Sequence, residues 1–121
     1  MKAIFKDDNT IFIEIWLGNS PYQMRKVLVS LDTGFNKDVY ISEEKAKELL
    51  LQPSKKGRIK LADETIVEGS LYYGYMSCDK VLAEVDIITH PNAKPHIGIG
   101  FFKKMGKEMI IDFVNKTVTF K

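Results

Sequence analysis

An acid, a hydroxyl residue and a glycine follow one another at Asp32-Thr33-Gly34, directly after an apolar run at residues 27–31. A strand that ends in this way places a carboxylate at the mouth of a sheet, where the glycine lets another backbone approach closely. Such a carboxylate can act as a general acid or base in hydrolysis. The same residues also suit an ordinary turn, so the rest of the sequence has to distinguish the two interpretations.

The composition is that of a folded protein of one domain. The 121 residues are 45% hydrophobic and 28% charged, a balance typical of globular rather than disordered chains. The net charge of +2 is too small to indicate a nucleic-acid partner, and the apolar runs are too short to span a membrane. Cys78 is the single cysteine, which excludes an internal disulfide and suits a reducing compartment. We therefore expect a single domain over residues 1–121 in the cytoplasm, with no nucleic-acid and no membrane partner.

Short strands separated by turn residues dominate the chain. Alternating apolar residues and β-branched runs predict strands over residues 2–6, 10–17, 24–31, 38–41, 58–61, 66–76, 81–88, 109–113 and 117–120. Residues 58–75 are expected to form a hairpin, and the polar residues 54–57 before it a loop. Many short strands at this spacing predict an all-β barrel or sandwich.

One helix is expected, over residues 42–51. Ser42 is a good N-cap, two glutamates follow it, and Leu49 and Leu50 contribute to an apolar stripe. Pro53 limits how far this helix can run. A shorter helical turn is expected near residues 101–105.

Three further features follow the Asp-Thr-Gly in order. The stretch at residues 32–36 reads Asp-Thr-Gly-Phe-Asn, and residues 61–64 in the expected hairpin read Leu-Ala-Asp-Glu. Residues 96–102 read His-Ile-Gly-Ile-Gly-Phe-Phe, and the late strand at residues 111–113 reads Ile-Asp-Phe. In this order and spacing the chain resembles the retropepsin-like (clan AA) aspartic proteases, particularly their single-domain bacterial and archaeal members.

The resemblance implies a closed acid-protease β-barrel with one short helix after the Asp-Thr-Gly strand and a short helical turn near the C-terminus. It also implies an aspartic endopeptidase, in which two carboxylates share a proton and activate a water. The chain has one Asp-Thr-Gly, so the second carboxylate must be Asp32 of another copy in a homodimer. By the same resemblance Thr33 would hydrogen-bond the two active-site loops together, and Gly34 would leave room for the peptide substrate. No cofactor and no metal are expected.

The resemblance also implies where a peptide or protein substrate would bind. The hairpin would close over the substrate and exclude water. The expected substrate-binding residues are Phe35, Asn36, Ala62, Asp63 and Glu64. The glycine of the late element falls at Gly98 or Gly100, of which we prefer Gly98.

Other interpretations stay open. Asp32 could be a structural turn acid in a catalytically inactive protein of the same fold, which would serve as a dimerisation or peptide-binding module. A generic β-barrel ligand binder is a third possibility. Asp112 is better explained as an acid that supports the fold than as a second catalytic acid. His90, His96 and Cys78 lack the paired spacing of a zinc site.

Overall fold

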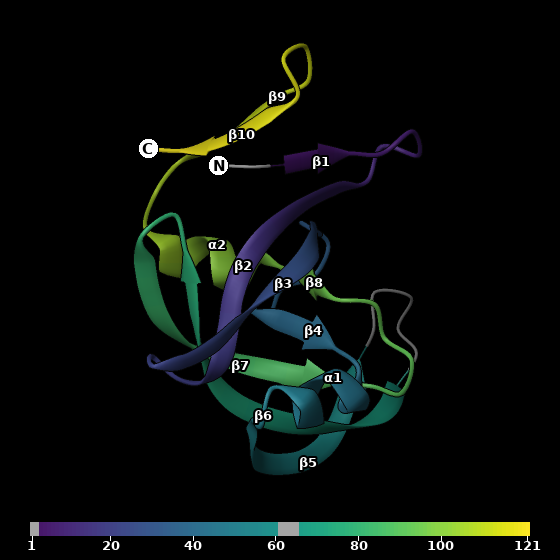
Figure 1. Ribbon diagram of the computed structural model, residues 1–121. Helices are drawn as coiled ribbons and strands as arrows, with labels where there is room; N and C mark the ends of the chain where they lie inside the picture. The colour runs from purple at the N-terminus through teal and green to yellow at the C-terminus, as the bar shows by residue number, and fades with distance from the viewer. Residues whose placement is uncertain (1–2, 61–65) are drawn as a thin grey trace.

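The computed structural model describes residues 3–60 and 66–121, which form ten strands and two helices (Figure 1). In chain order they are β1 (Ala3–Phe5), β2 (Ile11–Ser20), β3 (Gln23–Leu31), β4 (Val39–Ile41), α1 (Glu43–Glu48), β5 (Gln52–Lys60), β6 (Ile66–Cys78), β7 (Val81–Thr89), β8 (His96–Ile97), α2 (Ile99–Met105), β9 (Met109–Asp112) and β10 (Thr117–Phe120).

Six of the strands close into a barrel. Eight strands share one sheet in the order β1-β2-β3-β8-β4-β7-β6-β5, and a further pairing joins β2 to β6. The closed ring is therefore β2-β3-β8-β4-β7-β6, with β1 and β5 outside it. The prediction of an all-β fold is confirmed, and the pairing of β2 with β6 makes it a closed barrel.

The core is built from the alternating apolar residues of these strands. In the β2–β3 hairpin Ile13 lies opposite Val29 and Ile15 opposite Val27, and all four side chains are buried. Phe101 of α2 is fully buried in the same cluster. Successive residues of a strand point to opposite faces, so one face of this hairpin lines the barrel and the other meets solvent.

Strand β8 lies between β3 and β4. It runs parallel to β3, with Leu31 opposite Ile97, and antiparallel to β4, with Val39 opposite Ile97. The loop that leaves β3 must therefore pass over the end of β8 before it enters β4. This crossing brings two distant parts of the chain together next to Asp32.

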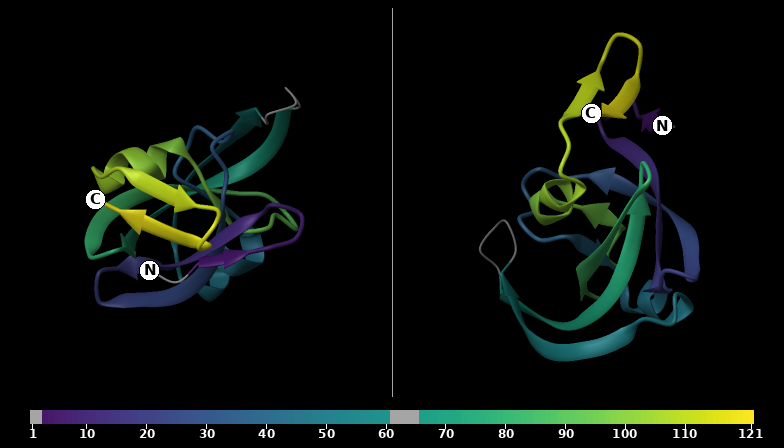
Figure 2. Two further views of the ribbon diagram at one scale, coloured as in Figure 1. Left: turned by 90° about the horizontal axis from the view of Figure 1, so that it is seen from above. Right: turned by 90° about the vertical axis from the view of Figure 1, so that its left-hand side faces the viewer.

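The C-terminal hairpin forms a second, two-stranded sheet. Strands β9 and β10 project away from the barrel beside β1, as two views show (Figures 1 and 2). The rings of Phe5 and Phe113 pack edge to face at 6.1 Å, and Val118 is fully buried. Strands β9 and β10 lie where strands were predicted over residues 109–113 and 117–120, and they pair on either side of the turn at Asn115 and Lys116.

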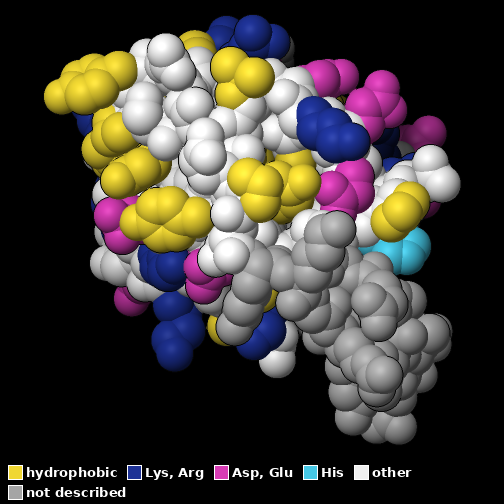
Figure 3. All heavy atoms as spheres, turned by 90° about the horizontal axis from the view of Figure 1, so that it is seen from below, with side chains coloured by type: hydrophobic (Ala, Val, Ile, Leu, Met, Phe, Trp, Pro, Cys, Tyr) yellow, Lys and Arg dark blue, Asp and Glu magenta, His cyan; other side chains and the backbone are white. Residues whose placement is uncertain are grey.

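The surface of the described residues carries mixed charge. Seen from below, Lys and Arg side chains lie among Asp and Glu side chains (Figure 3). In residues 3–60 and 66–121 no helix has both the length and the apolar character needed to cross a membrane.

Helix α1 is shorter than the sequence predicts. Ser42 does cap its N-terminus, accepting a hydrogen bond from the Lys45 N–H at 3.0 Å, but the helix ends at Glu48 rather than near Leu51. Leu50 has a left-handed φ of 56° and is 63% exposed, so it does not belong to the buried stripe. The Leu51 N–H donates to the Ala46 carbonyl, a hydrogen bond that closes helix ends around a left-handed residue. A leucine in that position gives no sequence signal for it.

The expected loop at residues 54–57 is wrong, because these residues belong to β5. Strand β5 pairs with β6 over most of its length, including Gly57 opposite Gly69. The register shifts between Pro53 and Lys55, where proline lacks an N–H for the ladder. Pairing with the long strand β6 outweighs the polar composition of the segment. The predicted hairpin over residues 58–75 is confirmed by the β5–β6 pairing.

Candidate active site

Asp32 lies directly after β3, in the loop that crosses the end of β8. Its N–H donates to the Ile97 carbonyl at 2.9 Å, which anchors its backbone to β8. Its Oδ1 accepts a hydrogen bond from the Gly34 N–H at 2.9 Å, and its side chain is 47% exposed. The carboxylate is thus held in one orientation while its second oxygen, Oδ2, stays free of that bond. This is a suitable arrangement for an acid that must reach a substrate or a second carboxylate.

Two glycines allow the loop after Asp32 to pack against the start of α2. A Cβ on Gly98 would lie 2.1 Å from the Phe35 carbonyl oxygen and 2.7 Å from that of Lys37. A Cβ on Gly100 would lie 2.3 Å from Oδ1 of Asp38. Both candidate glycines therefore lie against this loop, and Gly98 is the one that touches the residue directly after the triplet.

A buried acid fixes the far end of the same loop. Asp38 is 5% exposed, and its Oδ2 accepts hydrogen bonds from Lys104 Nζ at 2.6 Å and from the Asp86 N–H at 2.9 Å. Lys104 Nζ also donates to the Glu84 carbonyl at 2.9 Å. A buried carboxylate needs such partners, and here they connect the loop to α2 and β7.

His96 lies beside the candidate catalytic acid, Asp32. The sequence did not indicate that these two residues are neighbours. Its Nε2 is 3.8 Å from Asp32 Oδ2, and its ring packs against those of Phe35 and Tyr40 at 5.0 and 4.7 Å. Burial lowers the pKa of His96, although the Lys94 carbonyl and the Asp32 carboxylate oppose this by raising it. Its only sequence signal was its position directly before Ile97-Gly98.

The predicted site residues differ in their exposure and in whether the structure describes them. Asp32, Thr33 and Gly34 share one loop, in which Thr33 and Gly34 are exposed. Phe35 is half-buried beside Asp32, held by the Tyr40 and His96 rings, while Asn36 is exposed. The other expected substrate-binding residues, Ala62, Asp63 and Glu64, lie outside the described residues.

The other acidic and metal-ligating candidates have structural explanations. Asp112 accepts hydrogen bonds from the Val114 and Asn115 N–H groups, both at 2.9 Å, and the bonds from Asn115 lower its pKa. It therefore shapes the β9–β10 turn. Within residues 3–60 and 66–121 no group of three His, Cys, Asp or Glu residues is arranged to hold a metal ion.

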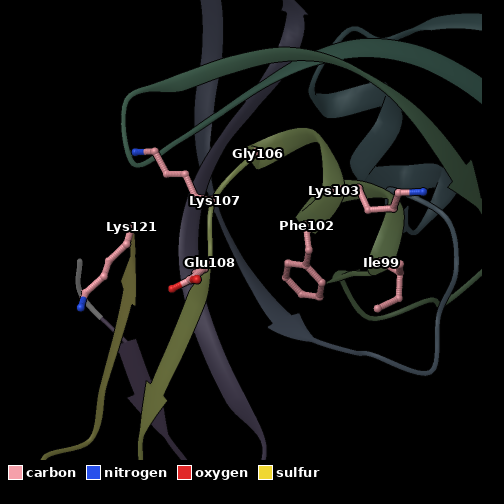
Figure 4. A pocket seen from close by; sticks show the side chains of 7 residues that line it. All are labelled: Ile99, Phe102, Lys103, Gly106, Lys107, Glu108 and Lys121. Atoms are coloured by element: carbon pink, nitrogen blue, oxygen red, sulfur yellow. The ribbon is translucent and has the colours of Figure 1, made fainter.

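A surface hollow of about 600 Å³ lies between α2 and the terminal hairpin (Figure 4). Ile99 and Phe102 form its apolar wall, and Lys103, Lys107 and Lys121 surround it. Residues 32–34 do not line it. We therefore assign the hollow no part in the chemistry of Asp32.

Comparison with known proteins gives a structural relative. No protein-family model matches the chain, and no curated protein matches its sequence. The fold is similar to the crystal structure of the retroviral protease-like domain of Ddi1 from Leishmania major, with a TM-score of 0.55 over 91% of this chain and 88% of that chain. The two sequences are 12% identical, so the similarity is one of fold. The chain thus has the all-β, closed-barrel fold of a retropepsin-like, retroviral protease-like domain.

Proposed function

We propose that the protein is an aspartic endopeptidase that acts as a homodimer and hydrolyses peptide bonds in peptides or proteins. The observation that carries this proposal is the Asp32 carboxylate, held by the Gly34 N–H at 2.9 Å and 47% exposed at the loop of a retroviral protease-like barrel. Peptide hydrolysis by carboxylates needs two of them close together, so that one accepts a proton from water while the other donates a proton to the scissile carbonyl.

The second carboxylate would come from Asp32 of another copy. Each chain supplies one Asp-Thr-Gly. Thr33 is exposed and so available to hydrogen-bond a facing loop. The terminal hairpin also exposes apolar side chains, with Phe113 at 68% and Val114 at 89%. Exposed apolar surface of this kind favours association between chains.

The remaining parts of the proposal concern the substrate and the compartment. Phe35 and Asn36 would contact the substrate next to the dyad, and Ala62, Asp63 and Glu64, which lie between β5 and β6 in the sequence, would cover it. We place the protein in the cytoplasm because its single cysteine, Cys78, is buried and unpaired with any other cysteine of the chain.

The test is cleavage of unfolded protein substrates by the wild type and by Asp32→Asn, with products identified by mass spectrometry between about pH 3 and pH 8. We expect Asp32→Asn to lose roughly 10³-fold or more in rate, because the asparagine cannot take part in proton transfer. A pepstatin-like inhibitor should block the wild type.

Asp8→Asn is the matched control. Asp8 Oδ1 accepts a hydrogen bond from the Thr10 N–H at 3.0 Å, the same two-residue turn that Asp32 makes with Gly34. Because Asp8 lies in the β1–β2 turn, its replacement should leave cleavage unchanged. Equal cleavage by wild type and Asp32→Asn would refute the catalytic role. A strict monomer in sedimentation experiments would refute the dyad and favour an inactive peptide-binding module.

A further inference from the structure

The two ring nitrogens of His96 have different partners, and this determines which of them carries the proton. Nδ1 lies 3.1 Å from the Lys94 carbonyl oxygen, and Nε2 lies 3.8 Å from Asp32 Oδ2. A carbonyl oxygen can only accept a hydrogen bond, so Nδ1 must donate to it. In the neutral ring the proton therefore sits on Nδ1, and Nε2 presents a lone pair to the carboxylate.

A neutral imidazole and an ionised carboxylate in this arrangement would face each other with lone pairs only. One added proton removes that repulsion. The proton can lie on Oδ2 of Asp32, which then donates to Nε2, or on Nε2 of His96, which then faces the ionised carboxylate as an imidazolium. The charges balance in both forms, because one proton joins a pair that was singly negative. The separation of 3.8 Å is longer than a hydrogen bond and within ion-pair range. Hydrogen bonds of catalytic groups often tighten only when substrate is bound.

Among the residues that the structure describes, Asp32 is the charged group that faces His96. Tyr40, on β4, packs on the ring at 4.7 Å, and burial raises its pKa, so it stays neutral. Phe35, from the loop after Asp32, covers the ring at 5.0 Å and carries no charge. Lys94 contributes its backbone carbonyl. The His96 side chain is 21% exposed, so the imidazole is screened from water more than the carboxylate it faces.

We propose that His96 and Asp32 hold one proton together, and that His96 is a positioning residue through which pH sets the charge of the catalytic carboxylate. This inference rests on the proposed function for its effect on cleavage, and the pairing itself can be measured without any cleavage. In a homodimer two such imidazoles would lie beside the two Asp32 carboxylates.

The direct test follows the imidazole signals of the full chain by NMR over a pH titration, in the wild type and in Asp32→Asn. The chain has two histidines, so His90 serves as an internal control in the same sample. We expect the pKa of His96 to fall further in Asp32→Asn, because the negative charge that raises it against the effect of burial is gone. The His90 signal should be unchanged by the substitution. An identical His96 titration in both would overturn the proposal.

The reciprocal variant, His96→Gln, distinguishes loss of the pair from a change of fold caused by Asp32→Asn. In the wild type the Asp32 carboxyl carbon signal should show a second inflection where His96 titrates, and this inflection should disappear in His96→Gln. Its persistence in His96→Gln would also overturn the proposal.

Cleavage gives a separate readout. An imidazolium favours ionised carboxylates and so disfavours the singly protonated dyad. In His96→Leu the alkaline limb of kcat/KM should therefore move to higher pH. An unshifted limb would overturn the role of His96 in catalysis. If the wild type cleaves nothing, the proposed function fails, and the NMR titration still decides whether the pair exists.

Discussion

Replacement of Gly98 by alanine tests how the loop carrying Asp32 is held. Gly98 has φ −129° and ψ −165°, an extended backbone that any residue adopts, so the substitution acts through space alone. The new Cβ would lie 2.1 Å from the Phe35 carbonyl oxygen, 2.6 Å from Phe35 Cδ2 and 2.7 Å from the Lys37 carbonyl oxygen. Two of these three atoms belong to the backbone, which cannot rotate away as a side chain can.

The magnitude follows from the displacement that the methyl group requires. A carbon and a carbonyl oxygen approach to about 3.3 Å, so the Phe35 backbone must move by roughly 1 Å. The Phe35 carbonyl accepts from the Ile99 N–H at 2.8 Å, and the Lys37 carbonyl from the Gly100 N–H at 3.1 Å. Losing both hydrogen bonds costs about 2 kcal/mol, and overpacking adds about 1–3 kcal/mol. We expect Gly98→Ala to lower the free energy of unfolding by about 3–5 kcal/mol.

Urea unfolding followed by fluorescence of Trp16, the single tryptophan, measures this change at a fixed protein concentration. Gly106→Ala is the matched control. Gly106 has a φ of 64°, and a Cβ there would meet nothing within 4 Å, so that variant tests backbone strain without a clash. It should cost about 1–2 kcal/mol. If Gly98→Ala is no less stable than Gly106→Ala, the steric explanation of the loop is wrong.

Two further predictions concern buried polar groups away from Asp32. Tyr72→Phe removes the hydroxyl that donates to Glu43 Oε2 at 2.9 Å, and should lower the free energy of unfolding by about 1–2 kcal/mol near neutral pH. Burial raises the pKa of Glu43, but hydrogen bonds from Thr89 and Tyr72 outweigh it and the net pKa is lowered. The stabilisation that Glu43 provides is therefore complete above its pKa in the unfolded chain, and it is lost as the pH falls through its lowered pKa in the folded protein. The urea midpoints of Tyr72→Phe and wild type should then converge toward about pH 3. A difference that stays constant with pH would contradict this. Burial raises the pKa of the Cys78 thiol to about 12. A disulfide reagent at about pH 8 should therefore label the folded protein at least about 100-fold more slowly than the urea-unfolded chain. Equal labelling rates would contradict the burial of Cys78.

The sequence determined the parts of the molecule that depend on neighbouring residues. Alternation of apolar residues correctly predicted β2 and β3, because one face of a strand is buried and successive side chains point to opposite faces. The turn at Asp79 and Lys80, both with positive φ, lies where turn residues separate two strands. The Asp-Thr-Gly after an apolar strand correctly placed an acid at the end of β3.

Only the tertiary structure decided what surrounds that acid. The insertion of β8 between β3 and β4 is a pairing between distant segments, and it alone brings His96 to 3.8 Å from Asp32. Local sequence carries no information about such a parallel pairing, because its register is set by the closure of the whole barrel. The same reason explains β5, whose polar residues pair with β6 although their composition favours a loop. The sequence thus identified the catalytic candidate, and the barrel supplied the neighbour that we propose controls its charge.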